Sequence, residues 1–313
     1  MVRTETNKQP LIIDIKGNSL DDGPGIRSVV FFKGCPLDCI WCHNPESKNT
    51  GAELFWEKEK CIDCGDCVQA CPAGAIARDN PFHVDRERCN LCFECLDICP
   101  SQALKRMGRK ISVEEIVRQI IPYKPFFSIS GGGVTLSGGE PTMYMQFASA
   151  LLKELKKAEI HTILETCGLF NMNGFKQMML PYLDEIYIDI KLIDPVEHKR
   201  YCGVSNKKIL INFLDLCDES RSGRFKLLPR TPLIPDITDG DKQISELADF
   251  YKRNNIFCAS LLPNNPMWMD KCAKLGKEAP FGRSTPIGSF YDQERKTRIK
   301  RHFSSHGIQV TFD

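Results

Sequence analysis

Residues 33–47 read KGCPLDCIWCHNPES and contain three cysteines at the spacing Cys35-x3-Cys39-x2-Cys42. Thiolates this close together in one loop are metal ligands first in a reducing compartment. Two kinds of metal centre fit the spacing. One is a zinc ion with His43 as its fourth ligand, and the other is a four-iron cluster in which one iron lacks a protein ligand and stays open.

The composition is that of an ordinary globular protein. Of 313 residues, 42% are hydrophobic and 26% are charged, and the formal net charge is +2. This balance predicts no general attraction to nucleic acid or to membranes. The first ten residues, MVRTETNKQP, contain no apolar signal segment, and no apolar run approaches the roughly 20 residues that span a bilayer. We therefore expect a cytoplasmic protein.

Cysteine is the exception, because eleven of the sixteen cysteines lie between Cys35 and Cys99. Eight of them form two runs with the spacing of bacterial two-cluster ferredoxins, Cys61-x2-Cys64-x2-Cys67-x3-Cys71-Pro72 and Cys89-x2-Cys92-x2-Cys95-x3-Cys99-Pro100. In such runs the fourth cysteine crosses to the other cluster. The predicted ligand sets are Cys61, Cys64, Cys67 and Cys99 for one [4Fe–4S] cluster, and Cys89, Cys92, Cys95 and Cys71 for the other. Zinc also uses CxxC pairs, but a zinc site needs two pairs and not this doubled run.

The cysteine-rich segment interrupts a regular pattern. Residues 51–110 have no long periodic stretch, which predicts a small inserted domain held by metal rather than by a hydrophobic core. Elsewhere, strands alternate with helices, which predicts βαβ units and a parallel sheet. The predicted strands are 10–16, 28–33, 133–137, 162–165, 185–190, 224–228 and 256–262, and the predicted helices are 113–121, 143–158, 175–182, 207–216 and 242–253.

About six such repeats predict an α/β fold, a partial (β/α)6 TIM-type barrel rather than the closed eight-unit barrel. The barrel would comprise residues 1–54 and 106–313, and the ferredoxin-like two-cluster domain would comprise residues 55–105. We expect the active site at the carboxyl ends of the strands, where the glycine-rich turns lie.

One such turn is SGGEP at residues 137–141. Gly138 and Gly139 allow close approach of backbone to a ligand, and the carboxylate of Glu140 can pair with an ammonium group. On its own, a turn of this kind is more often structural than functional. Because it ends a predicted strand and follows a three-cysteine loop, we interpret it as part of a ligand site.

Four motifs occur in order along the chain, DGPGIR at 22–27, CHNPES at 42–47, SGGGVTLSGGEPT at 130–142 and DIK at 189–191. Together with the C-x3-C-x2-C spacing they closely resemble the activating enzymes of glycyl radical enzymes, within the radical S-adenosylmethionine (SAM) superfamily. The resemblance extends from about residue 10 to about residue 270. The two ferredoxin-like runs resemble the larger, insert-bearing members of the family.

The resemblance implies an oxidoreductase that installs a glycyl radical on a partner enzyme. An open iron chelates the amino and carboxylate groups of SAM, and one electron cleaves SAM to methionine and a 5′-deoxyadenosyl radical, which takes a hydrogen from a glycine Cα. The implied cofactors are three [4Fe–4S] clusters and SAM, with a monovalent cation as a further candidate. The implied partners are a glycyl radical enzyme and, as electron donor, flavodoxin or ferredoxin.

The resemblance also implies roles for individual residues. The SAM site would contain Trp41, Gly138, Gly139, Glu140, Asp189, Lys191, Arg230 and Asn265. Glu165 and Thr166, with Asp189, align with residues that bind a monovalent cation in a relative. Asn265 departs from the family, because it lies in LLPNNP (261–266) where many members have a histidine, and asparagine cannot titrate. Without the resemblance, Trp41 would be read as a core residue, Asp189 as a strand end and Arg230 as a surface cation.

Two alternatives belong to other classes. A polyferredoxin electron carrier explains the two ferredoxin-like runs but not the loop at 33–47 or the SGGEP turn. A radical SAM enzyme acting on another peptide or on a small molecule would usually carry its additional clusters after the barrel, whereas here they interrupt it. The other cysteines, Cys167, Cys202, Cys217, Cys258 and Cys272, lack ligand spacing and are predicted to be buried or incidental thiols. The basic stretch 294–302 predicts a solvated helix face.

Overall fold

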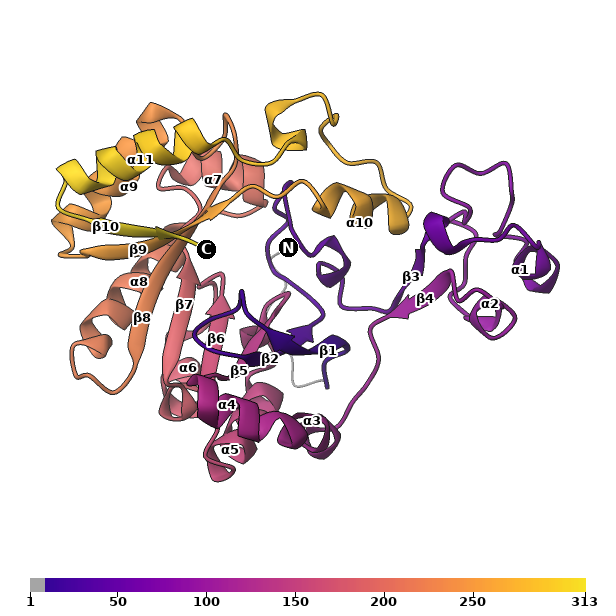
Figure 1. The fold of residues 1–313 in the computed structure, drawn as a ribbon, viewed down its shortest axis with the longest axis horizontal. Helices are drawn as coiled ribbons and strands as arrows, with labels where there is room; N and C mark the ends of the chain where they lie inside the picture. The colour runs from indigo at the N-terminus through magenta and orange to yellow at the C-terminus, as the bar shows by residue number, and fades with distance from the viewer. Residues whose placement is uncertain (1–8) are drawn as a thin grey trace.

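The computed structural model describes residues 9–313, and an eight-stranded sheet forms its main body (Figure 1). The strand order is β1-β2-β5-β6-β7-β8-β9-β10. β1 is antiparallel to β2, and the other neighbours are parallel. The strands are β1 (Ile12–Ser19), β2 (Arg27–Phe32), β5 (Gly133–Gly138), β6 (His161–Thr166), β7 (Glu185–Asp189), β8 (Lys226–Leu233), β9 (Cys258–Pro263) and β10 (Gln309–Phe312).

Helices connect the parallel strands and lie along the outer side of the sheet (Figure 1). In α5, the buried residues Ala148, Leu151, Leu152 and Leu155 recur at the helical period and face the core. The helices of the main body are α3 (Val113–Ile120), α4 (Lys124–Ser130), α5 (Met145–Lys157), α6 (Met172–Met178), α7 (Pro195–Cys202), α8 (Lys207–Ser220), α9 (Asp241–Arg253), α10 (Trp268–Lys274) and α11 (Gln293–Ser305).

The predicted alternation of strands and helices is confirmed, because each predicted strand between residues 133 and 262 overlaps one observed parallel strand. The boundary of β8 is wrong in the prediction. β8 continues to Leu233 through Pro229 and Pro232, although proline within a run argues against a strand. The sequence pattern also misses β10, which follows the basic helix α11 and adds a strand parallel to β9.

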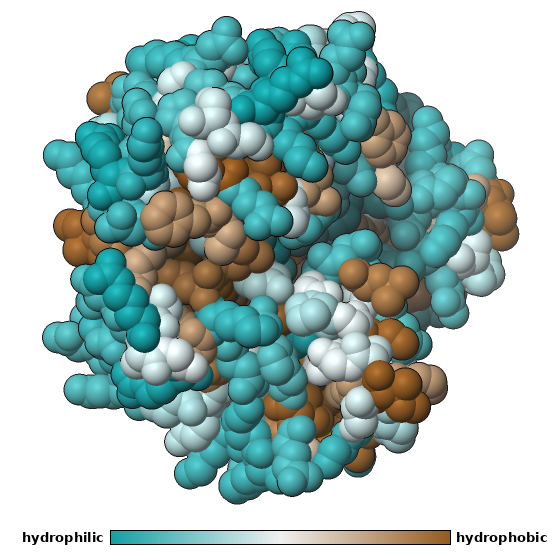
Figure 2. Space-filling model, turned by 60° about the vertical axis from the view of Figure 1, so that its left-hand side comes forward, coloured by the Kyte–Doolittle hydropathy of each residue, from teal (hydrophilic) through white to brown (hydrophobic). Residues whose placement is uncertain are grey.

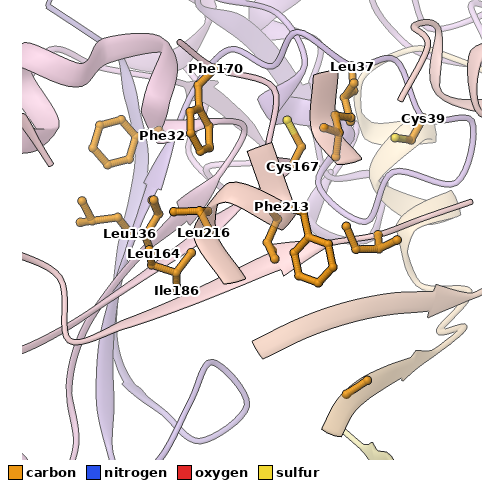
Figure 3. Packing of buried hydrophobic residues seen from close by; sticks show 14 of the residues in the cluster. Phe32, Leu37, Cys39, Leu136, Leu164, Cys167, Phe170, Ile186, Phe213 and Leu216 are labelled. Carbon is orange, nitrogen blue, oxygen red and sulfur yellow. The ribbon is translucent and has the colours of Figure 1, made fainter. Parts of the chain in front are cut away.

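A row of apolar residues holds the centre of the sheet together. Leu136 of β5 is paired with Leu164 of β6, which is paired with Ile186 of β7, and all three are fully buried. Figure 3 shows these side chains next to one another, with Phe213 and Leu216 of α8 in the same core. Burial of each such side chain contributes about 1.5–3 kcal/mol. This row fixes the register in which the carboxyl ends of the strands lie together.

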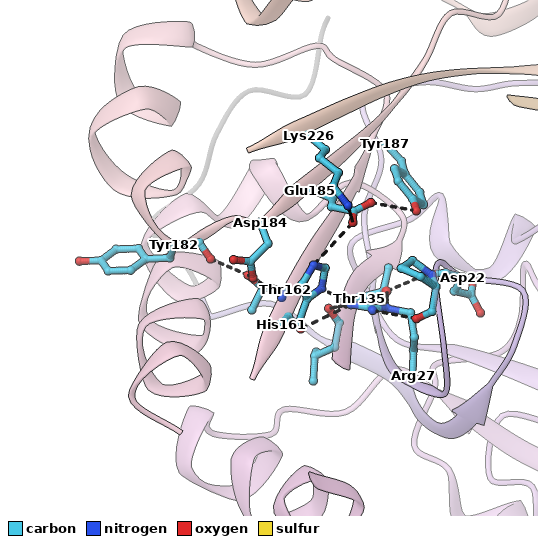
Figure 4. Close-up of polar contacts among 12 residues, drawn as sticks. Asp22, Arg27, Thr135, His161, Thr162, Tyr182, Asp184, Glu185, Tyr187 and Lys226 are labelled. Atoms are coloured by element: carbon cyan, nitrogen blue, oxygen red, sulfur yellow. Dashed lines mark hydrogen bonds and ion pairs between the residues drawn. The ribbon is translucent and has the colours of Figure 1, made fainter. Parts of the chain in front are cut away.

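At the amino ends of the strands, buried hydrogen bonds replace apolar packing (Figure 4). Arg27 is fully buried and donates to Thr135 Oγ1 (2.7 Å), to the Val134 carbonyl (2.8 Å) and to the Pro24 carbonyl (3.2 Å). Burial lowers the pKa of Arg27 to about 10. A buried cation needs such partners, because an unpaired charge is costly away from water. The arginine of the DGPGIR motif therefore holds the β1–β2 hairpin against β5.

A smaller lobe, residues 53–107, lies to one side of the sheet (Figure 1). It contains a two-stranded antiparallel sheet, β3 (Glu53–Trp56) and β4 (Leu104–Met107), and the short helices α1 (Asp66–Ala70) and α2 (Glu94–Asp97). Its own cluster of buried residues is small and consists of Leu54, Cys67, Ile76, Val84, Cys95 and Leu104. Since two of these are cysteines, little apolar surface stabilises the lobe.

Two cations, the buried Lys33 and the half-buried Arg86, connect the lobe to the main body. Lys33, just after β2, donates its Nζ to the Glu53 carboxylate at 2.6 Å. Arg86 of the lobe donates to the carbonyls of Leu54 (2.6 Å) and of Lys274 at the end of α10 (3.3 Å). These contacts fix the lobe next to α10.

The outer surface is largely hydrophilic, with hydrophobic side chains in small separate groups on the face shown in Figure 2. Large exposed apolar side chains such as Ile129, Val196 and Phe290 come from different segments. Within residues 9–313, no helix combines the length and the apolar character needed to cross a membrane.

Candidate functional site

Loops at the carboxyl ends of the parallel strands line a cavity of about 1390 Å³. The sequence predicts the site at this end of the sheet. The cavity wall contains Cys35, Cys39, Trp41, Cys42, Gly138, Gly139, Glu165, Thr166, Asp189, Lys191, Arg230 and Asn265. The tertiary structure thus brings together the residues predicted for the first cluster, for SAM and for the cation, with the exception of Glu140.

Cys35, Cys39 and Cys42, in the loop after β2, lie close enough for their thiols to interact electrostatically. Burial, with further contributions from the negative charges of Cys39 and Cys35, raises the pKa of the Cys42 thiol to about 12. Such a thiol stays protonated at neutral pH until a metal displaces the proton, because metal ligands must be thiolates. The raised pKa therefore argues against a reactive free thiolate at Cys42.

Two further cysteines, which the sequence pattern does not assign to the site, adjoin this loop. A hydrogen bond between Cys202 of α7 and Cys39 lowers the pKa of the Cys39 thiol. A hydrogen bond with Cys35, together with burial, raises the pKa of the Cys167 thiol. Cys167 directly follows a strand end, β6, which is a signal that could have placed it at the site. Cys202 carries no such signal in the sequence.

The SGGEP turn is built differently from the sequence prediction. Glu140 is fully buried, and its carboxylate accepts hydrogen bonds from Thr142 (2.7 Å), Thr166 (2.9 Å) and the backbone N–H of Cys167 (2.7 Å). These donors fix the carboxylate in place, and Glu140 is not among the residues that line the cavity. Glu140 instead ties the turn to the end of β6.

The two glycines of the turn are required by the neighbouring backbone. A Cβ on Gly138, whose φ is +100°, would meet the backbone N and O of Phe32 at 2.6 Å. A Cβ on Gly139 would meet the Gly34 carbonyl oxygen at 2.1 Å. The glycines therefore allow the turn to approach the start of the cysteine loop, and they also lie on the cavity wall.

Four charged side chains from three adjacent strand ends form a compact group. Arg230 donates to Glu165 (2.6 Å) and lies 3.5 Å from Asp189, and Lys191 donates to Asp189 (2.6 Å). Burial opposes ionisation of Asp189, but Lys191 and Arg230 outweigh burial and lower its pKa. The negative charge of Asp189 likewise raises the pKa of Lys191 above its ordinary value despite burial. Asp189 and Lys191 therefore hold each other in their charged forms, within a group of two carboxylates and two cations.

This group retains unsatisfied hydrogen-bonding capacity. Asp189 Oδ1 and Arg230 Nε are buried and have no hydrogen-bond partner within the described chain. These two atoms face each other at 3.5 Å, and both side chains line the cavity, where their other polar atoms can meet a ligand. The residues present thus fit a zwitterionic ligand such as SAM.

Two residues predicted for SAM, Trp41 and Asn265, are far apart in the sequence, but both line the cavity. Trp41 is 5% exposed and packs against Tyr201, with ring centroids 6.1 Å apart. Asn265, after β9, accepts a hydrogen bond from the backbone N–H of Met267 (3.1 Å). Trp41 is therefore both a core residue and a cavity residue, and Asn265 shapes the turn into α10.

Helix α10 contributes two residues that the sequence analysis misses. Lys271 donates to Asn44 (2.7 Å) and Glu46 (2.9 Å) and so holds the end of the cysteine loop. The buried indole N–H of Trp268 has no hydrogen-bond partner within residues 9–313, and Trp268 lines the cavity. No short motif marks either residue, and the contact of Lys271 with Asn44 spans 227 residues of sequence.

In the lobe, eight thiols fall into two groups. Burial and then the neighbouring charges of Cys99, Cys61 and Cys64 raise the pKa of the Cys67 thiol. These four thiols, called the Cys67 set, line one small pocket. Burial and then Cys89, Cys67, Cys92 and Cys71 raise the pKa of Cys95 to about 12. We call Cys89, Cys92, Cys95 and Cys71 the Cys95 set.

No group of three or more Cys, His, Asp or Glu residues within residues 9–313 is arranged to hold a single metal ion.

Comparisons with known proteins agree with this geometry. Residues 29–248 match the family model of the radical SAM superfamily. The chain is 37% identical to the isethionate sulfite-lyase activating enzyme of Desulfovibrio desulfuricans, over 94% of this chain and 96% of that protein. It is 36% identical to the trans-4-hydroxy-L-proline dehydratase activating enzyme of Clostridioides difficile, over 96% and 98% of the two chains.

A solved structure shows the same fold at low identity. A radical SAM methyltransferase from Sphaerobacter thermophilus superposes with a TM-score of 0.56 at 14% identity, over 97% of this chain and 77% of that one. This likeness concerns the fold alone. Radical SAM proteins bind a [4Fe–4S] cluster and SAM, and the cavity contains residues suited to both. The chain belongs to the radical SAM superfamily and, within it, to the activating enzymes of glycyl radical enzymes.

Proposed function

We propose that this chain installs a glycyl radical on a partner glycyl radical enzyme. The observation that carries the proposal is the cavity at the carboxyl end of the sheet, which joins a three-cysteine loop to a group of two cations and two carboxylates. The named relatives activate different enzymes at closely similar identity, 36% for the hydroxyproline dehydratase activator and 40% for a sulfopropanediol dehydratase activator. What they share with this chain is therefore the activation step.

Cys35, Cys39 and Cys42 would hold the first [4Fe–4S] cluster. Such a cluster, with one iron free of protein ligands, binds SAM and on reduction yields a 5′-deoxyadenosyl radical, which takes a hydrogen from the partner glycine. The role of the chain is to hold SAM, orient it and exclude water. Cys167 and Cys202 adjoin Cys35 and Cys39, and Cys167 also lines the cavity.

The charged group would bind SAM rather than a monovalent cation. SAM carries a carboxylate, an ammonium and a sulfonium, and the wall offers two cations and two carboxylates. A cation at Glu165, Thr166 and Asp189 would need net negative charge. Arg230 already neutralises Glu165, and the Thr166 hydroxyl already donates to Glu140. We therefore assign this group to SAM.

We assign residues 55–105 to an inserted domain with two further [4Fe–4S] clusters, and residues 1–54 and 106–313 to the barrel. The grouping of the thiols into the Cys67 set and the Cys95 set supports the crossed ligand pattern. The lobe has a small apolar core, so cluster binding would supply much of its stability. Electrons would come from flavodoxin or ferredoxin.

The test uses the full chain, reconstituted with iron and sulfide without oxygen, with reductant, SAM and a glycine-loop peptide deuterated at the glycine Cα. Deuterium in the released 5′-deoxyadenosine, measured by mass spectrometry, is the expected result. The control is the same peptide with alanine in place of the labelled glycine, which should give unlabelled product.

Unlabelled 5′-deoxyadenosine from the deuterated peptide would refute glycine as the target and leave a radical SAM enzyme that acts on another molecule. An absence of SAM cleavage in protein with full iron content would favour an electron carrier.

A further inference from the structure

His83 of the lobe lies beside one thiol of the Cys67 set. Its Nε2 is 3.3 Å from Cys67 Sγ, and the residue is 5% exposed. The imidazole stacks on Trp56, with ring centroids 4.7 Å apart and planes 15° apart. This stacking fixes the plane of the ring and keeps Nε2 directed at the sulfur.

Ser101 approaches a second thiol of the same set. Its Oγ is 3.7 Å from Cys99 Sγ. A thiolate has no proton to donate, so the imidazole N–H of His83 and the hydroxyl of Ser101 are the donors once the thiols are deprotonated. Both side chains line the small pocket formed by the Cys67 set.

The lobe is an internal repeat, which makes the two thiol sets comparable. An offset of 28 residues relates each cysteine of the first run to one of the second, for example Cys61 to Cys89. The backbone follows the same offset. The isolated antiparallel bridge between Ile76 and Val84 corresponds to the pairing of β4 with β3 one repeat away, at positions 104 and 56.

The repeat shows that the two side-chain donors occur beside the Cys67 set and have no counterpart beside the Cys95 set. The position equivalent to His83 is Phe55, and the position equivalent to Ser101 is Ala73. Neither of these side chains can donate a hydrogen bond. The Cys67 set therefore has two side-chain donors whose counterparts are missing at the equivalent positions of the Cys95 set.

We propose that His83 and Ser101 raise the reduction potential of the cluster bound by the Cys67 set, through hydrogen bonds to Cys67 and Cys99. The proposal rests on the cluster assignment made above. Reduction adds negative charge to the cluster and its sulfurs, and a hydrogen-bond donor at sulfur stabilises the reduced state more than the oxidised one. Both are positioning residues that act through the ligands.

Arg86 acts on the other set and must be kept constant. It is mostly buried and lies within electrostatic range of Cys89 and Cys95. A cation there also favours the reduced state. The comparison that isolates the two donors is therefore between variants of the same set and not between the two sets.

The experiment uses the full chain with Cys35→Ala, Cys39→Ala and Cys42→Ala, so that the lobe alone binds clusters. Iron is counted, and the midpoint potentials are measured by a redox titration followed by electron paramagnetic resonance. His83→Phe places at this position the residue that the repeat already accommodates at Phe55. We expect one of the two potentials to become more negative and the other to stay unchanged.

Two controls separate hydrogen bonding from packing. His83→Gln retains an N–H donor and should restore part of the shift. Ala73→Ser introduces the missing hydroxyl near the Cys95 set and should raise the other potential.

Ser101→Ala removes the second donor with a small change of volume. It should lower the potential of the cluster bound by the Cys67 set by less than His83→Phe does.

Unchanged potentials in His83→Phe and Ser101→Ala at full iron content would overturn this proposal and leave the cluster assignment intact. If the parent chain binds no iron in the lobe, both the proposal and the cluster assignment fail. If His83→Phe loses iron, Ser101→Ala decides, because a shift there supports the proposal and the absence of a shift overturns it.

Discussion

Arg230 and Glu165 form a buried ion pair across an intervening strand, with 2.6 Å between Arg230 Nη1 and Glu165 Oε1. Arg230 lies on β8 and Glu165 on β6, so the pair spans β7, whose last residue, Asp189, lies 3.5 Å from Arg230 Nε. The pair lies at the carboxyl end of the sheet, on the wall of the cavity. It makes the geometry of the site dependent on the register of three strands.

Replacing the arginine of this pair should damage both stability and SAM binding. Arg230→Met leaves Glu165 and Asp189 as buried carboxylates with too little positive charge, which typically costs about 3–5 kcal/mol. We expect a clearly lower free energy of unfolding and a loss of SAM affinity, measured by denaturant titration and by calorimetry under anaerobic conditions. Arg224→Met is the control, because the Arg224–Glu219 pair is exposed and such pairs contribute about 0–1 kcal/mol. Equal losses in the two variants would contradict the role of the buried pair.

Removal of one cysteine from the first loop should abolish SAM cleavage without unfolding the lobe. Cys42→Ala should lower the iron content by about four atoms per chain, since two cysteines hold a four-iron cluster poorly. The absence of 5′-deoxyadenosine is the expected activity result. Cys258→Ala, at an exposed thiol in β9, should leave iron content and cleavage unchanged. Full cleavage activity in Cys42→Ala would refute the ligand assignment.

The SGGEP turn should not tolerate a side chain at its second glycine. In Gly139→Ala, the new Cβ would lie 2.1 Å from the Gly34 carbonyl oxygen, so the backbone of the turn or of the cysteine loop must move. We expect a lower melting temperature and weakened cluster binding, measured by calorimetry and by iron analysis. Gly51→Ala is the matched control, because a Cβ there meets nothing within 4 Å. A melting temperature in Gly139→Ala equal to that of the control would show that the turn is not packed as described.

Stability should depend on pH through His198. This residue is 1% exposed, and burial lowers the pKa of its imidazole, although Nδ1 lies 2.7 Å from the Val204 carbonyl. Below the ordinary histidine pKa of about 6.5, the unfolded chain binds a proton that the folded chain resists. The contribution of His198 to stability is therefore present at higher pH and declines as the pH falls through 6.5, by up to about 1.4 kcal/mol per pH unit.

His198→Asn tests this dependence, because the asparagine amide can still donate to the Val204 carbonyl. Denaturant midpoints at pH 8.0 and pH 5.5 should differ less in the variant than in the original chain. The same loss on acidification in both proteins would assign the pH dependence to other groups.

Much of the fold and of the chemistry can be predicted from local patterns. The spacing of Cys35, Cys39 and Cys42 identifies a metal site, because cluster ligands must be close along the chain to wrap one cubane. The alternation of apolar strands with helices predicts the parallel sheet, because a βαβ unit repeats over short distances. Both features depend on neighbours in the sequence. The alternation is confirmed by the sheet, and the metal site stays a prediction.

Local patterns do not show interactions between residues that are far apart in the sequence. Nothing near Glu140 in the sequence shows its partners, yet its carboxylate accepts hydrogen bonds from Thr166 and from the N–H of Cys167. Pro229 and Pro232 argue against a strand, but β8 accommodates both. In each case, a contact with another strand decides the outcome.

The sequence by itself determined which residues could hold iron and that strands and helices alternate, since spacing and periodicity are local properties. The tertiary structure decided which groups meet, for example Arg230 with Glu165, His83 with Cys67 and Lys271 with Asn44. The physical reason is that hydrogen bonds and ion pairs act over a few ångströms in space, and only the packing of the sheet, the lobe and α10 brings these distant segments within that range.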